Sequence, residues 1–233
     1  MFSNSNILVA PTLHTPKCTD LNGTFSDCVN LLYADLSNWT LSKVVTVSFM
    51  FEGCERVSTI IFPKGLKPTY AERMFYNCRD LTQVNIKDID FSQCTNMASA
   101  FYNCNELTVI PRLNTVNCTK LGSIFSGAYN LVRVEGIDMK SVSENESLFG
   151  SLYSDNKKLR YLLIKHFGNS NMSTSYTSFK RLSYWGLNDT ANPDAKQSLI
   201  DTFITNSMDR SSNPMTVTLH ANVLARFTAD EIQ

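Results

Sequence analysis

The chain has 233 residues, of which 43% are hydrophobic and 18% charged, so its composition is that of a folded globular protein rather than a disordered tail. Its 21 basic and 21 acidic residues cancel to zero net charge, which excludes the basic footprint of a nucleic-acid-binding protein. No apolar run approaches the roughly 20 residues that a membrane span needs, so we expect no membrane insertion. Residues 1–10 lack the basic start and long apolar run of a secretory signal. We therefore expect that a signal was removed or that export takes another route.

A phenylalanine recurs at intervals of about 24 to 26 residues along most of the chain. The series consists of Phe25, Phe51, Phe75, Phe101, Phe125, Phe149 and, after an insertion, Phe179. A cysteine stands three residues after each of the first four, Ala128 stands there after Phe125, and the later copies carry leucine. Self-similarity at a period of about 20 to 50 residues indicates a solenoid of stacked units.

The unit is clearest between Phe75 and Ile86, where it reads F-x-x-C-x-x-L-x-x-V-x-I. Its end alternates apolar and polar residues, which predicts a short strand. The segment around Met74 and Phe75 has an apolar spacing nearer three and predicts a helical turn. One such rung cannot bury its apolar side alone, but stacked rungs can, with parallel strands about 4.8 Å apart.

The seven cysteines fall into two columns of this repeat. Cys28, Cys54, Cys78 and Cys104 follow the phenylalanines, and Cys18, Cys94 and Cys118 precede them by seven residues. Because valine, alanine or leucine fills the same columns in other copies, we expect small, buried, reduced side chains. A disulfide between neighbouring rungs is the less favoured alternative, since it needs demanding geometry. The odd count, the absence of C-x-x-C and the scattered histidines argue against a metal site.

The repeat rhythm changes after residue 164. The elements expected beyond it are a loop at 166–178, strands at 181–187 and 215–220, a helix at 193–206 and the start of another helix at 228–231. The helix at 193–206 rests on Asn192 as its N-cap and Pro193 at its first position. We predict a repeat domain over 1–187 and a small α/β cap over 188–233 that covers the end of the solenoid.

Three segments carry a resemblance to a known family: Met74–Ile86, Met50–Ile60 and the connector Leu36–Val44. Together they resemble the BspA-like leucine-rich repeats over roughly residues 8–187. Such repeats occur in surface proteins of gut and oral bacteria and in some phage-encoded proteins. The resemblance implies a leucine-rich-repeat superhelix, display at the cell surface or outside the cell, and binding without catalysis. We therefore expect an α/β fold, a right-handed leucine-rich-repeat solenoid with short parallel strands and a small α/β C-terminal cap.

No catalytic constellation stands out in the sequence. It has no G-x-S-x-G, H-E-x-x-H, P-loop or G-x-G-x-x-G pattern, and acidic residues such as Asp88, Asp90 and Glu135 are scattered. We expect neither an enzyme nor a cofactor.

The outward positions of the predicted strands suggest a binding face. Those expected to bind a ligand are Tyr33, Asp35, Gln83, Asn85, Arg133, Glu135, Tyr161 and Tyr184. The same two columns contain Thr59, Val109, Ile61, Pro111 and Leu163, which are also expected to be exposed. Tyrosine and arginine are favoured in binding hot spots. The alternative is a wettable sheet without a ligand, or one that a neighbouring domain covers.

The leading functional hypothesis is a binding or adhesion module, displayed outside the cell, for a host or bacterial surface protein or glycan. The alternative is a phage-encoded receptor-binding or structural tail component, released by assembly and lysis.

Overall fold

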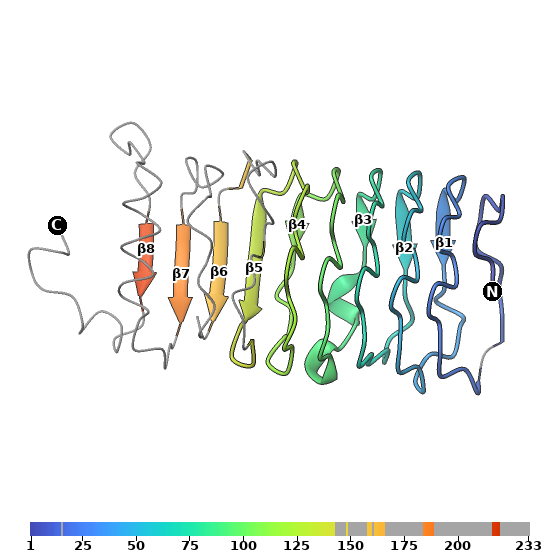
Figure 1. Ribbon diagram of the computed structural model, residues 1–233, viewed down its shortest axis with the longest axis horizontal. Coiled ribbons are helices and arrows are strands. Elements are labelled where there is room, and N and C mark those ends of the chain that lie inside the picture. The colour runs from blue at the N-terminus through green and yellow to red at the C-terminus, as the bar shows by residue number, and fades with distance from the viewer. Residues whose placement is uncertain are drawn as a thin grey trace, which may run out of the picture.

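The computed structural model describes residues 1–14, 16–142, 148, 158–159, 161–165, 184–188 and 216–219. Its strands stand side by side in chain order along the long axis of the molecule (Figure 1). The strands are β1 Tyr33–Asp35, β2 Thr59–Ile61, β3 Gln83–Val84, β4 Val109–Ile110, β5 Arg133–Asp138, β6 Tyr161–Lys165, β7 Tyr184–Asn188 and β8 Thr216–Leu219. Two short 3-10 helices, η1 Ile86–Asp88 and η2 Phe91–Gln93, follow β3.

All strand pairs are parallel and form two sheets, β1-β2-β3 and β4-β5-β6-β7-β8. The expected strand at 181–187 is confirmed as β7 and that at 215–220 as β8, which extends the sheet beyond residue 187. The predicted helices at 193–206 and 228–231 and the loop at 166–178 lie outside the described residues.

A second line of parallel contacts joins the rungs away from these strands. It consists of single bridges in the order Asp20, Thr46, Tyr70, Asn96 and Lys120. The residue after each bridge, for example Leu21 or Val47, is buried. Each rung is therefore fastened to its neighbours at two places, and its apolar side chains point into the space between them.

The segments around the repeat phenylalanines were predicted as helical turns, but they are successions of tight turns. Residues two before and two after each phenylalanine have positive φ, as at Arg73 (51°) and Asn77 (59°) around Phe75. Left-handed residues interrupt an α-helix, because the helical hydrogen bond to residue i−4 needs right-handed backbone throughout. The backbone N–H groups donate to the next rung instead, as from Phe75 to Ala100 O at 2.9 Å.

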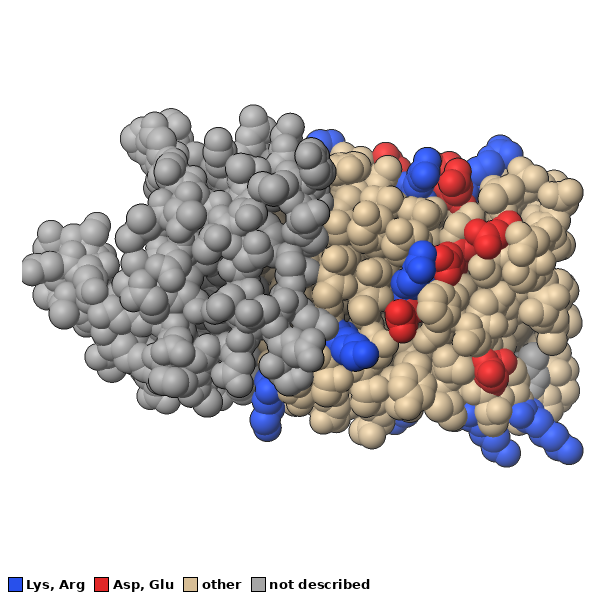
Figure 2. All heavy atoms as spheres, viewed as in Figure 1, with Lys and Arg blue, Asp and Glu red and all other residues tan. Residues whose placement is uncertain are grey.

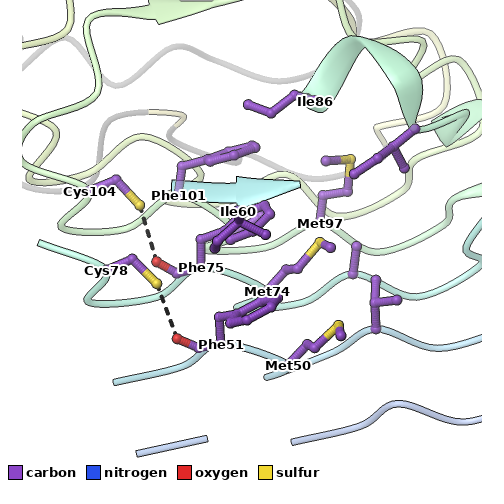
Figure 3. Packing of buried hydrophobic residues seen from close by; sticks show 14 of the residues in the cluster. Met50, Phe51, Ile60, Met74, Phe75, Cys78, Ile86, Met97, Phe101 and Cys104 are labelled. Carbon is purple, nitrogen blue, oxygen red and sulfur yellow. Dashed lines mark hydrogen bonds between the residues drawn. The ribbon is translucent and has the colours of Figure 1, made fainter. Parts of the chain in front are cut away.

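A continuous stack of phenylalanine rings forms the core of the described rungs. Phe25, Phe51, Phe75, Phe101 and Phe125 follow one another with centroids 5.1 to 6.1 Å apart and interplanar angles up to 24°. Beside them runs a column of methionines that includes Met50, Met74 and Met97 (Figure 3). One phenylalanine every 24 to 26 residues therefore places one ring in each rung, stacked on the ring of the rung before it.

All seven cysteines are free thiols, and six are buried, whereas Cys18 is half-buried. The thiol of each cysteine after a phenylalanine donates to the backbone carbonyl of the preceding rung's phenylalanine. The Sγ–O distances are 3.0 Å from Cys54 to Phe25, 3.1 Å from Cys78 to Phe51 and 3.1 Å from Cys104 to Phe75, and two of these bonds are drawn in Figure 3. Burial raises the pKa of all three thiols. The reduced thiols predicted from the two columns are confirmed, but Cys18 is half-buried where a buried side chain was expected.

Candidate functional site

The outward side chains of the strands form one face, which we call the strand face. The register places Tyr33 beside Thr59 and Thr59 beside Gln83 in the first sheet. In the second sheet, Val109 lies beside Arg133, Arg133 beside Tyr161 and Tyr161 beside Tyr184. Because a rung adds one residue to this column, the strand face is a row of side chains along the solenoid axis.

These positions differ in exposure. Tyr33 is 36% exposed and Val109 is 44% exposed, whereas Thr59 and Tyr161 are half-buried. Gln83 and Arg133 are exposed. The side chain of Tyr184 lies outside the described residues. A partner on this face would therefore meet an uneven row in which aromatic, aliphatic and amide groups alternate.

Two of the predicted ligand-binding residues form hydrogen bonds with backbone groups of other residues in the chain. The carboxylate of Asp35 accepts a hydrogen bond from Ser37 N at 2.9 Å, and hydrogen bonds with Ser37 lower its pKa. Asn85 bonds Phe62 in both directions, accepting from Phe62 N at 2.7 Å and donating to Phe62 O at 2.9 Å. Its amide also donates to Asp88 Oδ2 at 2.9 Å. Both residues thus hold the chain where it leaves a strand.

Leu163 was predicted to be exposed, and this is wrong, because it is only 5% exposed. The neighbouring strand β5 has a register irregularity. Val134 pairs with Leu162, but Ile137 pairs with Ile164, so β5 holds one residue more than β6 over this stretch. The extra residue shifts the alternation of inward and outward positions within β5 and leaves that of β6 unchanged.

Arg133, Glu135 and Tyr161 form one cluster at the start of β5 and β6. The guanidinium carbon of Arg133 lies 3.9 Å from the centroid of the Tyr161 ring. Its Nε donates to Glu135 Oε1 at 3.0 Å. The three side chains were predicted individually, and the parallel register of β5 and β6 brings them together.

The sequence reasoning missed a set of exposed apolar residues beside this column. Leu8 and Val9 are each 55% exposed, Leu32 is 39% exposed and Val132 is 37% exposed. Leu32 N donates to Leu8 O at 2.8 Å, so the two leucines belong to adjacent rungs. Val9 bridges to Tyr33, and Leu32 and Val132 directly precede β1 and β5, so these exposed apolar residues border the row of first strand residues.

Among the first residues of the described strands only Arg133 is charged, whereas the segment just before each strand carries several charged residues. The charged residues of that segment are Glu55, Arg56, Arg79, Asp80 and Glu106. Arg79 pairs with Glu55 at 3.5 Å. On the face that Figure 2 shows, charged side chains form small mixed groups separated by wide uncharged areas. A row of mostly uncharged side chains bordered by charged residues has the composition of a protein interface.

The opposite, turn-bearing side holds a second cluster that the repeat pattern did not single out. The guanidinium carbon of Arg73 lies 4.0 Å from the centroid of the Tyr76 ring, and Tyr76 stacks on Tyr102 with centroids 4.6 Å apart. A terminal nitrogen of Arg73 forms an ion pair with Glu52, whose pKa is raised by burial. Tyr76 and Tyr102 each follow a repeat phenylalanine, so an alignment of the repeat copies places the two tyrosines in one column.

Within the described part of the chain, no group of three histidine, cysteine, aspartate or glutamate side chains is placed to hold a metal ion. No helix among the described residues has the length and apolarity to cross a membrane.

The comparison with protein families agrees with this architecture. The model of the BspA-type leucine-rich repeat region matches residues 21–159 in 6 copies. No curated protein and no solved structure shows a significant match. The matched region is more than half of the chain and covers the stacked phenylalanines, the cysteine ladder and strands β1 to β5. The chain therefore belongs to the family of BspA-type leucine-rich repeat proteins.

Proposed function

We propose that this chain is a non-enzymatic binding module that attaches to a protein or glycan surface through its strand face. The observation that carries this proposal is the row at the start of the strands, in which Tyr33, Gln83, Val109 and Arg133 are exposed and only Arg133 is charged. Leucine-rich repeats generally serve in protein binding, and stacked repeats form extended surfaces suited to it.

Rigidity is the physical advantage of such a face. The backbone of each rung is hydrogen-bonded to both neighbours, as Leu32 N is to Leu8 O and Ser58 N is to Leu32 O. Side chains held on a fixed backbone lose less conformational entropy when a partner docks. Many modest contacts can therefore add up along the row.

We further infer that the module acts outside the cell or on its surface, and that its coil is right-handed with a C-terminal cap over 188–233. The handedness rests on the strong preference of parallel crossovers for right-handed connections. The location rests on the family, whose surface proteins carry similar repeats.

The test is a binding screen of the purified chain against two kinds of surface. One kind is host material, namely epithelial cells, mucin and matrix proteins, and the other is intact gut bacteria and their polysaccharides. The strand-face variant Y33A/Q83A/Y161A is compared with Y70A/Y129A, which removes tyrosines that are 48% and 45% exposed elsewhere.

Binding that the strand-face variant loses and the control keeps would support the proposal. Equal loss in both variants, or binding by neither parent nor variants, would contradict it. Binding restricted to bacterial surfaces would favour a phage-encoded receptor-binding component over an adhesin for host tissue.

A further inference from the structure

The Arg133 cluster presents an arginine whose orientation is already fixed. The ring of Tyr161 supports the guanidinium from one side at 3.9 Å, and Glu135 accepts from Nε at 3.0 Å. The side chain of Arg133 is still 45% exposed. Within the described part of the chain, no residue accepts a hydrogen bond from either of its terminal nitrogens. Those nitrogens carry four of the five N–H donors of an arginine.

The second Arg–Tyr–Glu cluster of the molecule has the reverse arrangement. Arg73 also lies over a tyrosine, but its terminal nitrogen pairs with Glu52, and its buried Nε has no hydrogen-bond partner. Its outward end is therefore occupied by the protein itself. At Arg133 the inner nitrogen is occupied and the outward end is available, which is the arrangement that recognition of a partner requires.

Two exposed valines lie beside Arg133, as does its ion-pair partner Glu135. Val109, its register neighbour, is 44% exposed, and Val132, the preceding residue, is 37% exposed. Apolar neighbours exclude water when a partner docks, and an arginine hydrogen bond then becomes stronger. A planar guanidinium with both terminal nitrogens available matches the two oxygens of a carboxylate.

We propose that Arg133 anchors an aspartate or glutamate side chain of a protein partner, with an apolar residue of that partner resting on Val109 and Val132. This inference rests on the proposed function of the strand face and names the chemistry of its partner. A glycan carboxylate is the less suitable occupant. Sugar rings pack on open aromatic faces, whereas Arg133 covers the Tyr161 ring and the adjacent exposed groups are valines.

The experiment uses an array of immobilised peptides that contain one aspartate or glutamate next to leucine or valine. Each peptide has a partner in which asparagine or glutamine replaces the acidic residue, and uronic-acid oligosaccharides share the array. The full chain is compared with R133Q, R133K and the control R79Q, which removes an exposed arginine outside the strand face. Thermal midpoints of all variants should agree with the parent, because both arginines are largely exposed.

We expect the parent and R79Q to bind a subset of acidic peptides at least about tenfold more tightly than their amide partners. R133Q should lose this preference, and R133K should keep only part of it, because lysine offers no planar pair of donors. Equal binding of acidic and amide peptides, or no binding of either, would overturn the proposal. So would Arg133-dependent binding of uronic-acid oligosaccharides alone. Because the array does not use cells or tissue, its result is separate from that of the surface screen.

Discussion

At the scale of single residues, the repeat is specified by small side chains that meet backbone groups. Each cysteine after a repeat phenylalanine fills a small space and donates its thiol to the carbonyl of the preceding rung. Valine or alanine can fill the space but cannot make that bond. This explains why cysteine recurs in the column without any disulfide or metal.

The thiols should differ sharply in reactivity. In the native protein at neutral pH, iodoacetamide should modify Cys18 first, because it is the half-buried thiol. Cys54, Cys78 and Cys104 should react only on unfolding, since burial raises their pKa and the reactive form is the thiolate. Mass spectrometry of labelled peptides before and after denaturation measures this order. Fast labelling of Cys78 in folded protein would contradict the buried ladder.

The left-handed position two residues after each phenylalanine should tolerate few side chains. Gly127 has φ of 74°, and a Cβ there would collide with the Asn103 side chain, which donates to Asn77 at 2.9 Å. We expect G127A to lower the free energy of unfolding by about 2 kcal/mol. Gly65 has φ of 88°, but a Cβ added there would meet no atom within 4 Å, so G65A should cost only about 1 kcal/mol. Urea denaturation compares the two, and equal losses would show that the collision is relieved without strain.

At the scale of elements, the strands are short because each forms only one side of a rung before the chain turns. β3 has two residues, and the 3-10 helix η1 follows it after Asn85 alone. The Asn85 side chain replaces the backbone pairing that a longer strand would make with Phe62. The Asn85 side chain thus lets the chain leave β3 while the N–H and C=O of Phe62 remain hydrogen-bonded.

Asn85 should therefore affect stability rather than binding. N85A leaves the N–H and C=O of Phe62 without their partners, and we expect a loss of about 1–3 kcal/mol in the free energy of unfolding. N85D keeps the acceptor for Phe62 N but loses the donor and sets a second carboxylate against Asp88, so it should also be destabilised. Chemical denaturation measures both, with Q83A on the exposed neighbour as the control. A stable N85A that loses binding in the surface screen would restore Asn85 to the ligand-binding set.

Much of this element order could be predicted from the sequence, because the repeat forces equivalent residues into columns. The spacing of the phenylalanines and leucines located the strands and the cysteine ladder. It did not locate the register irregularity in β5, since the extra residue leaves the apolar pattern intact, and it did not reveal the burial of Leu163. The spacing also did not predict the turns with two left-handed residues, because phenylalanine and arginine, which have positive φ at Phe49 and Arg73, seldom adopt it. The Arg133–Tyr161 contact depended on register across two rungs, which a linear pattern does not contain.

At the scale of the whole molecule, each rung contacts only its neighbours, so stability is distributed along one dimension. The phenylalanine stack is an example, because among the described residues the ring of Phe75 stacks only on those of the two adjacent rungs. Its centroid lies 6.1 Å from that of Phe51 and 5.3 Å from that of Phe101. A defect in one rung should weaken the adjacent rungs first.

F75A tests this expectation. Removing a fully buried phenylalanine should lower the free energy of unfolding by about 3–5 kcal/mol. Native-state hydrogen exchange should speed up most in peptides from the rungs of Phe51 and Phe101 and least near Phe25. Y70A, which removes a 48% exposed ring, should leave exchange unchanged. A uniform increase over all described rungs would show instead that the stack opens as one cooperative unit.

The hydrogen bonds between successive turns all point the same way. Gly23, Phe25 and Asp27 donate to Ser48, Met50 and Glu52 of the following rung, and the pattern repeats at Phe51, Phe75 and Phe101. Peptide dipoles of about 3.5 D therefore align along the long axis on this side, much as they do in a single α-helix. The strand side, where bonds run in both directions, cannot cancel this alignment. The stack thus has an electrical polarity, with carbonyl oxygens facing one way and amide hydrogens the other, and a further rung can join the ladder in one orientation only.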